Sequence, residues 1–565
     1  MKVSANKSAA NKMAPTTPAI QARLLSPSCI RWLLLAILCV ALYLRTAHMD
    51  VMLWAGNDPA GATWPAVQMA QGVELPKHGL MSSVGVWLPP LEIYLLAPFF
   101  LFSQNPTCFP YSWAVICTGA VFLCYLIGRR FFSEKVGLVA AALFAVAPWP
   151  VMFSRQAWCQ GIVHGITVAL LWFWCRFLTV KKPRDLFWVV LLTLFAAQIH
   201  LAAPALIVLG VAVWLILRFP LYWKPIATAI AINLITIVPY IDFQMEHGWE
   251  DFKRTGSVMK SFNEYQPYSI EGVHPQFGFP LPSRNHFTHI LNLASGRQFE
   301  ELNGLSTPKF NSLPGMFLIN GLSAFEKFAI FAALVVLGVF LARKARPSER
   351  FPYFDLTDEP VLTLLFLWMI VPWAFFVVTG MKSYVIYFSF IFPVPFVLIG
   401  WLVERVQEFG ARRPEKLLGR SLRTGSLVVV LALVAGQGLF VERLYRFWDR
   451  EGGALGTRGE NYKCQLAISE AIVEHAQVKN PTVSSDWPPH TPVHLGIQYL
   501  LWWKLRDRPL PAALSRGTPQ TAFVMVDMRF KKDTDVPPPL DRLAYRAFGP
   551  LRLYEIPVRA EKESP

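Results

Sequence analysis

Long apolar runs, each roughly as long as a bilayer is thick, recur through most of this chain and exclude an ordinary soluble fold. The first covers residues 30–47 and the last covers residues 425–443. A helix needs about 20 mostly apolar residues to cross the hydrocarbon core of a membrane. Of the 565 residues, 54% are hydrophobic and only 16% are charged. The sequence therefore predicts an α-helical polytopic membrane protein.

Positive charge is the second constraint, because the formal net charge is +16. A charge of this size can indicate a nucleic-acid partner. Most of the Lys and Arg residues, however, lie in short segments between apolar runs, such as 129–135 and 404–423. Clusters of this kind are typical of cytoplasmic loops, so we interpret them as topology determinants and expect no nucleic-acid partner. The 8 cysteines form no CxxC metal pattern and no disulfide framework.

The topology depends on one ambiguous apolar run, residues 87–102, which contains Pro89, Pro90 and Pro98. If this run crossed the membrane, the basic loop 129–135 and the basic loops after it would face outward. If it lies at the membrane interface, every strongly basic loop falls in the cytoplasm, so we expect interfacial helices here. About eleven spans follow from this choice, at residues 30–47, 111–128, 136–153, 161–178, 186–201, 203–219, 225–243, 321–342, 361–379, 384–403 and 425–443.

These spans predict the domain organisation of a multi-pass protein of the cytoplasmic membrane with a cytoplasmic N-terminus. We expect the first span to be retained rather than cleaved as a signal peptide. An odd number of spans then places the C-terminal region outside, where strand-like runs at 482–485 and 522–526 predict a small extracytoplasmic α/β domain. The predicted parts are a cytoplasmic tail at 1–29, a transmembrane domain at 30–443 with outer loops at 48–110 and 244–320, and the α/β domain at 444–565.

Three polar features collect on the predicted outer side. Asp58 lies in the first outer loop, Arg155 in a turn between spans, and His200 at the end of a span. A carboxylate beside a membrane is costly unless it faces water, a cation or a reaction, and an Arg can hold a phosphate. Each has an ordinary alternative. Asp58 is also a turn former before Pro59, Arg155 an interfacial Arg that extends to the headgroups, and His200 a structural hydrogen-bonding residue.

The outer loop at 244–320 is too long to be a simple connector. It carries basic residues such as Lys253, Arg254 and Arg284 on the predicted outer side, which are either anion binders or part of a solvated face. The sequence contains no HExxH, P-loop, GxSxG or GxGxxG motif in a suitable context. This counts against hydrolase and ATP-driven pump functions.

Several short motifs follow one another over residues 30–255. They are NDPA at 57–60, GVELP at 72–76, GLMSSVG at 79–85, PPLEIYLLAP at 89–98, SRQAW at 154–158, QIH at 198–200 and PY at 239–240. In this order and spacing they resemble the membrane glycosyltransferases of the GT-C superfamily, the type that includes protein O-mannosyltransferases and the aminoarabinose transferases of lipid A. The C-terminal half resembles them in architecture alone.

The resemblance implies an enzyme that moves a sugar from a polyprenyl-phosphate donor to a lipid, glycan or protein acceptor on the outer face of the cytoplasmic membrane. Asp58 would be the general base that deprotonates the acceptor. Cationic side chains would neutralise the leaving phosphate. The candidates for this role are Arg155, Arg254 and Lys382. The residues expected to bind substrate are His200, Glu246 and Tyr94.

Three positions depart from the family pattern. The second acid is replaced by Pro59, the Lys before the Pro-Pro pair by Leu88, and the acid after the SR turn, where a metal can bind in some members, by a residue near Gln160. We assign no metal ligand and no certain cofactor, which leaves a divalent metal ion open. Two other functions stay open: a transporter or flippase for a lipid-linked sugar, and a non-catalytic envelope assembly protein. A transporter favours charges near the membrane midplane, whereas the predicted spans carry few.

Overall fold

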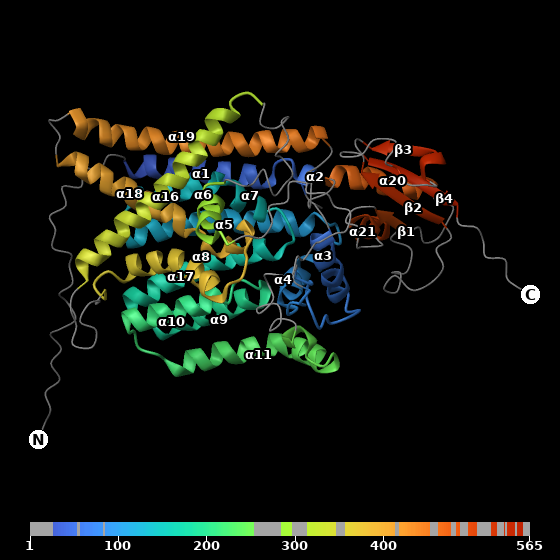
Figure 1. The fold of residues 1–565 in the computed structure, drawn as a ribbon, viewed down its shortest axis with the longest axis horizontal. Helices are drawn as coiled ribbons and strands as arrows, with labels where there is room; N and C mark the ends of the chain where they lie inside the picture. Colours follow the sequence, from blue (N-terminus) through green and yellow to red (C-terminus); the bar gives the residue numbers. More distant parts are fainter. Residues whose placement is uncertain are drawn as a thin grey trace, which may run out of the picture.

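A computed structural model describes residues 26–52, 57–82, 85–253, 284–296, 313–345, 356–412, 417–451, 461–475, 482–485, 495–504, 521–527, 536, 540–548 and 551–557. Among these residues, seven helices are long and apolar enough to cross a membrane, and they form one bundle (Figure 1). They are α1 (Pro27–Thr46), α5 (Cys108–Phe131), α8 (Cys159–Val180), α11 (Trp223–Glu246), α16 (Met316–Lys344), α17 (Pro360–Thr379) and α19 (Leu417–Glu451). The predicted polytopic helical membrane fold is therefore confirmed.

The helical pair η2 (Val385–Ile391) and α18 (Val394–Ala411) is bent by 64° and adds an eighth span if it is counted as one. Three further predicted spans fall on helices shorter than a bilayer requires. These are α6 (Glu134–Val146) with α7 (Pro148–Phe153), α9 (Pro183–Ile199) and α10 (Ala205–Leu217), which run alongside the long helices (Figure 1). The count of about eleven spans stays a prediction.

The ambiguous run at 87–102 contains only one short helix, α4 (Leu91–Phe100). Its 10 residues extend about 15 Å, roughly half the thickness of a hydrocarbon core. Pro90 precedes the first residue of α4, consistent with the preference of proline for helix starts. The helix α4 is therefore too short to cross the membrane in a single pass. Its location at the membrane interface stays a prediction.

Glycines allow the helices at the centre of the bundle to approach closely. A Cβ on Gly128 of α5 would lie 2.5 Å from the Cα of Gly137 in α6. A Cβ on Gly400 of α18 would lie 2.9 Å from the backbone oxygen of Val136, on the same helix α6. Small residues at such crossings let backbones meet within a membrane, where packing rather than the hydrophobic effect drives association. α6 is thus fixed between α5 and α18.

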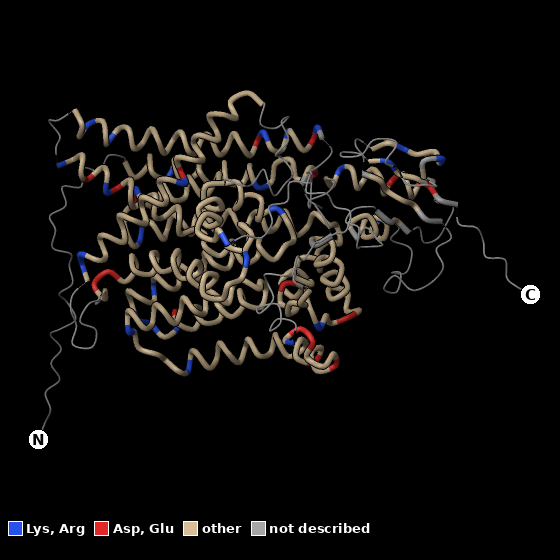
Figure 2. Tube along the Cα trace, in the orientation of Figure 1, with Lys and Arg blue, Asp and Glu red and all other residues tan. Residues whose placement is uncertain are grey.

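The two ends of the bundle differ in charge. The connections α5–α6, α8–α9 and α10–α11 carry basic clusters and lie at the left-hand end in Figure 1. Figure 2 shows Lys and Arg at these helix tips, and a group of Asp and Glu at the opposite end, where α11 ends. Of the predicted site residues, Glu246 is the last residue of α11 and so lies at this opposite end. Three shorter helices of the chain are α2 (Met49–Met52), α3 (Asn57–Ala70) and α13 (His286–Ala294).

A small mixed domain lies beyond the same end of the bundle (Figure 1). It contains α20 (Tyr462–His475), α21 (Leu495–Lys504), η5 (Leu540–Arg542) and a four-stranded sheet. The strands, in the spatial order β1-β2-β4-β3, are β1 (Thr482–Ser485), β2 (Thr521–Asp527), β4 (Leu551–Pro557) and β3 (Tyr545–Phe548). β1 and β2 are parallel, and the other pairs are antiparallel. The predicted small α/β domain is confirmed, with two strands that the sequence did not indicate.

The sheet domain rests on the first loop region through aromatic contacts. The Trp64 ring of α3 lies 5.6 Å from the Tyr499 ring and 5.5 Å from the Trp502 ring, both on α21. The Tyr499 hydroxyl donates a 2.7 Å hydrogen bond to the backbone oxygen of Gln104. These contacts place α3 between the bundle and the sheet domain.

Candidate functional site

The backbone places Asp58 in the first turn of α3. This helix packs against α4 and against α21 of the sheet domain. The side chain of Asp58 lies outside the described residues, as does the whole of Arg254. A carboxylate in the first turn of a helix is favoured by the partial positive charge at that end. The predicted base therefore lies on an element shared by the bundle and the sheet domain.

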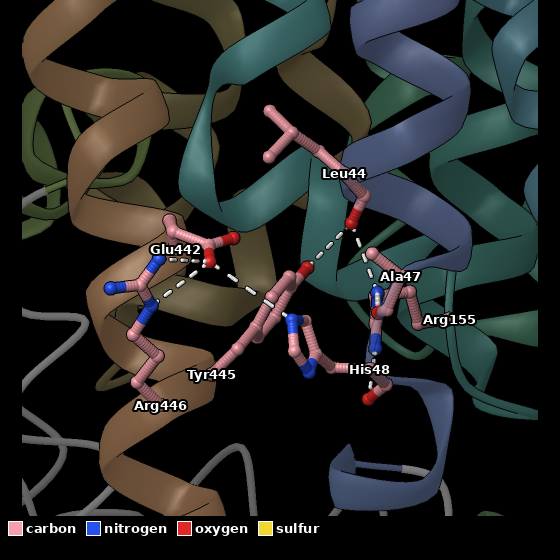
Figure 3. Close-up of polar contacts among 7 residues, drawn as sticks. All are labelled: Leu44, Ala47, His48, Arg155, Glu442, Tyr445 and Arg446. Carbon is pink, nitrogen blue, oxygen red and sulfur yellow. Dashed lines mark hydrogen bonds and ion pairs between the residues drawn. The ribbon is translucent and has the colours of Figure 1, made fainter.

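Arg155 is fully buried and is held by the end of α1 (Figure 3). Its Nη1 donates to the backbone oxygens of Leu44 at 2.9 Å and Ala47 at 2.6 Å, and its Nη2 donates to that of His48 at 2.8 Å. The last carbonyls of a helix have no partner within the helix. Arg155 thus satisfies the C-terminal carbonyls of α1 from a turn more than a hundred residues away.

Tyr445 of α19 completes this arrangement (Figure 3). The Arg155 Cζ lies 4.3 Å from the centroid of the Tyr445 ring, and the Tyr445 hydroxyl donates a 2.6 Å bond to the Leu44 oxygen. A guanidinium over an aromatic ring gains a favourable cation–π interaction. Both terminal nitrogens of Arg155 therefore donate hydrogen bonds to backbone oxygens. The contacts of Arg155 and Tyr445 join α1, the 154–158 turn and α19.

His200 lies in a second, separate place, at the end of α9. Its Nε2 is 3.4 Å from Gln160 Nε2 on α8, and its Nδ1 accepts a 3.2 Å bond from the Ala202 backbone N–H. The His200 ring meets the Tyr387 ring of η2 edge to face, with centroids 5.9 Å apart. Both His200 and Gln160 are buried. The predicted His and Gln160, near which the resemblance implied an acid, therefore lie side by side.

Lys382 belongs to the segment that leads into η2 and so lies near this second group. Its side chain is half-buried, and the structure gives it no hydrogen bond or ion pair with any described residue. Its neighbour Ser383 is fully buried and contacts two histidines of α13. Ser383 Oγ lies 2.7 Å from His286 Nδ1 and 3.2 Å from His289 Nδ1.

Burial favours the neutral form of both α13 histidines. Burial, and secondarily the nearby positive charge of Arg284, lowers the pKa of His286. Burial, and secondarily His286, lowers the pKa of His289 to about 4. A neutral imidazole both donates and accepts a hydrogen bond. Next to the cationic Lys382, this group can bind an oxygen-rich anion or a sugar hydroxyl. The sequence did not single out these histidines, because a His pair spaced by three residues is common on helices.

Tyr94 and Glu246 lie in a third place, where the first loop meets the end of α11. The Tyr94 hydroxyl donates a 2.6 Å bond to the Pro76 backbone oxygen, and burial raises its pKa to about 12. Glu246 forms an ion pair with Lys77, whose Nζ is also 2.6 Å from Asp242. These hydrogen bonds, first to Asp242 and then to Glu246, raise the pKa of Lys77 to about 12.

Asp251 also holds the first loop against α11, and the sequence analysis did not single it out. Its Oδ1 accepts a 3.2 Å bond from the Trp87 backbone N–H. Its Oδ2 accepts from Gln244 and lies 3.4 Å from the Tyr240 hydroxyl, whose single proton is donated to the Trp87 oxygen at 2.8 Å. Asp251 is buried, and a buried carboxylate needs such donors. The motif PY at 239–240 and the predicted residue Glu246 indicated this region in advance, but not Asp251 itself.

Within the described ranges, no three His, Cys, Asp or Glu side chains come together in a way that could hold a metal ion. The predicted site residues fall instead into three groups at one end of the bundle: Arg155 with α1 and α19, His200 with Lys382 near η2, and Tyr94 with Glu246 at α11. Asp58 lies on α3, next to the sheet domain.

No protein-family model and no curated protein sequence matches the chain. Solved structures do. The crystal structure of ArnT from Cupriavidus metallidurans bound to undecaprenyl phosphate matches with a TM-score of 0.53 and 11% identity, over 94% of this chain and 98% of that one. ArnT in the apo state matches with a TM-score of 0.54 and 11% identity, over the same shares. At 11% sequence identity, both matches rest on the similarity of the folds and not on the similarity of the sequences.

The oligosaccharyltransferase of Archaeoglobus fulgidus in the apo form matches with a TM-score of 0.50 and 12% identity. This chain covers 64% of its length, and 84% of this chain is matched. ArnT and this enzyme are both GT-C glycosyltransferases. The chain has the GT-C fold. The structural match to ArnT extends over nearly the whole chain, whereas the sequence motifs indicated the GT-C resemblance only up to about residue 255.

Proposed function

We propose that the chain is a glycosyltransferase that transfers a sugar from a polyprenyl-phosphate donor to a lipid, glycan or protein acceptor. The observation that carries the proposal is the match over 94% of the chain to ArnT, an aligned GT-C structure bound to undecaprenyl phosphate. A lipid phosphate is a good leaving group that needs cations more than it needs a strong general acid.

The charge difference between the two ends of the bundle supports the orientation of this reaction. Strongly basic connections favour the cytoplasmic side, and they lie opposite the sheet domain and the three groups of site residues. In this proposal the N-terminus is cytoplasmic, the sheet domain is extracytoplasmic, and the chemistry takes place on the outer face of the cytoplasmic membrane.

Asp58 is proposed as the general base that removes the proton of the attacking hydroxyl or amine. Lys382 is proposed to neutralise the donor phosphate, because its ammonium has no anionic partner among the described residues; Arg254 is proposed for the same role. Arg155 is proposed to act by positioning, since its two terminal nitrogens already bind the carbonyls at the end of α1.

Three residues near η2 and α11, of which His200 is buried, are proposed to shape the substrate site. His200 lies next to η2 and faces Tyr387, so it is proposed to contact the sugar or the phosphate. Tyr94 and Glu246 hold the first loop against α11 and are proposed to border the substrate site there. The sheet domain is proposed to help admit the acceptor, because it rests on the helix that carries Asp58.

One observation favours the alternative of a transporter for a lipid-linked sugar. Glu326 of α16 is a fully buried carboxylate inside a spanning helix, and such groups often belong to transport pathways. The two functions differ in their products, because a transporter moves the donor intact and a transferase cleaves the bond between sugar and phosphate.

The test uses the purified full-length chain in nanodiscs with radiolabelled polyprenyl-phosphate sugars and extracts of membrane lipids, glycans and proteins. The proposal predicts release of unlabelled lipid phosphate together with appearance of label in one acceptor fraction. Movement of intact donor across reconstituted vesicles, without cleavage, would establish transport instead. Binding of every donor without cleavage or movement would overturn both and favour an assembly role.

A further inference from the structure

A polar cavity lies inside the bundle, apart from the three groups of site residues. Its volume is about 330 Å³, several times the share of one water molecule in the liquid. The cavity is lined by the C-terminal end of α13, the first half of α16, the middle of α19 and Pro148. Its polar lining residues are Asn292, Ser295, Asn320, Ser323, Glu326, Lys327 and Gln437.

Glu326 is the acidic group of this cavity. It lies ten residues into α16, which is about 15 Å along the helix axis, and none of its side chain is exposed. Gln437 of α19 donates a hydrogen bond to one oxygen of its carboxylate. A carboxylate within a membrane is costly unless a cation or several donors compensate it. One amide donor is less than this group requires.

Three acceptor oxygens of the lining residues have no hydrogen-bond partner. They are Oε1 of Glu326, Oδ1 of Asn292 and Oε1 of Gln437. The three side chains are only 0%, 5% and 6% exposed, and buried acceptors in native proteins are nearly always satisfied. They come from three different helices, α16, α13 and α19. A missing group that offers several N–H donors and a positive charge would satisfy all of them.

We propose that this cavity binds the primary ammonium group of a membrane-lipid headgroup. An ammonium carries three N–H donors and one positive charge, which matches two neutral acceptors and one carboxylate. A hydroxyl group offers one donor, and a quaternary ammonium offers none. The inference is independent of the proposed transferase activity, because it rests on the cavity alone.

The surroundings favour a lipid over a free amine. The α16 side chains that point away from the bundle beside the cavity are apolar and exposed, among them Phe317 at 94% and Phe328 at 64%. Surfaces of this kind face acyl chains in a membrane helix. The phosphate that neighbours the ammonium in such a headgroup is negative, and Lys327 lines the same cavity. A zwitterionic aminophospholipid therefore fits the charges on both sides.

The test is native mass spectrometry of the full-length chain released from nanodiscs that contain equal parts of phosphatidylethanolamine, phosphatidylcholine and phosphatidylglycerol. We expect retention of phosphatidylethanolamine at least about tenfold above phosphatidylcholine, because a charge-assisted hydrogen bond is lost without the N–H donors. Glu326→Gln should abolish this preference. Glu408→Gln, which changes a half-exposed Glu on α18 that pairs with Arg405, should keep it.

Adding free ethanolamine separates the two sources of an ammonium group. Displacement of the lipid by millimolar ethanolamine would show that the ammonium itself is recognised, and an unchanged lipid signal would show that the lipid's phosphate and chains are needed as well. Both results support an ammonium site. Equal retention of the two lipids by the wild-type chain, or an unchanged preference in Glu326→Gln, would overturn it.

A second variant keeps the test decisive if Glu326→Gln folds poorly. Asn292→Leu removes another unpartnered oxygen at similar volume, outside the spanning helices. It should lower the preference for phosphatidylethanolamine while the midpoint of thermal unfolding in detergent stays near that of the wild type. A full preference in a folded Asn292→Leu protein would show that this oxygen does not contact the ligand, and would contradict the proposed arrangement of acceptors.

Discussion

The guanidinium of Arg155 lies over the ring of Tyr445, with Cζ 4.3 Å from the ring centroid, while both groups bind the carbonyl oxygen of Leu44. Three segments distant in sequence meet at this one oxygen: the end of α1, the 154–158 turn and α19. The segment that leads from α1 toward Asp58 begins at this junction. A buried cation that binds backbone carbonyls therefore holds the end of α1, from which the chain continues toward α3.

Arg155→Lys tests this positioning role. A Lys keeps the charge but cannot donate to three carbonyls in a fixed fork, so we expect the free energy of unfolding to fall by on the order of 3 kcal/mol. The measurement is the midpoint of thermal unfolding in detergent. Arg446→Lys, at a 69% exposed arginine side chain one residue beyond Tyr445, should leave it unchanged. A stable Arg155→Lys protein with weakened donor binding would instead assign Arg155 to the phosphate.

Lys382→Met tests the phosphate site. If Lys382 binds the donor phosphate as proposed, its removal should raise the KM for the polyprenyl-phosphate sugar about tenfold, with a smaller effect on kcat, because one charge-assisted contact is lost in both the ground and the transition state. Lys382→Arg should recover much of the loss. Lys344→Met, at the opposite end of the bundle, serves as the control. An unchanged KM in Lys382→Met would place the phosphate elsewhere.

Asp251→Ala tests how the first loop is held. Without its carboxylate, the Trp87 N–H and the Gln244 amide lose their acceptor, which costs about 1–3 kcal/mol for buried donors. We expect the backbone amide of Trp87 to exchange with deuterium at least about tenfold faster, read by mass spectrometry of peptides. Glu250→Ala, next in sequence and exposed, is the matched control. Identical exchange in both variants would mean that other contacts hold the loop.

Acidification tests the α13 histidines. Burial lowers the pKa of His289 to about 4, from an ordinary value near 6.5. Between these two pH values, His289 is protonated in the unfolded chain and neutral in the folded chain. Stability is therefore full above pH ~6.5 and is lost as the pH falls toward 4. His289→Gln should reduce the drop in thermal midpoint between pH 7 and pH 5, and His247→Gln, at an exposed position, should not. An equal drop in both would assign the acid sensitivity to other groups.

The sequence predicted the membrane class, the two ends of the bundle and the GT-C resemblance because these depend on local features: apolar runs, basic clusters and short motifs. It could not predict contacts between residues far apart. Lys77 pairs with Glu246 at a separation of 169 residues, and Arg155 binds carbonyls 107–111 residues away. In the sequence alone, Lys77 and Arg155 each look like an ordinary surface or interfacial cation. Strands β3 and β4 were missed; β3 has only four residues, and both strands carry charged residues, such as Arg546 and Arg552, within a short run.

The measurement that tests the central claim most directly is single-turnover transfer from a polyprenyl-phosphate sugar by wild type and by Asp58→Asn in nanodiscs. Asp449→Asn, an exposed Asp paired with Lys463, is the matched control. Loss of a general base typically costs about 10²–10⁴-fold in rate. We predict a loss in this range for Asp58→Asn with donor binding intact, and wild-type transfer for Asp449→Asn. Transfer by Asp58→Asn at the wild-type rate would contradict the assigned base, and no cleavage of any donor by the wild type would contradict the enzyme itself.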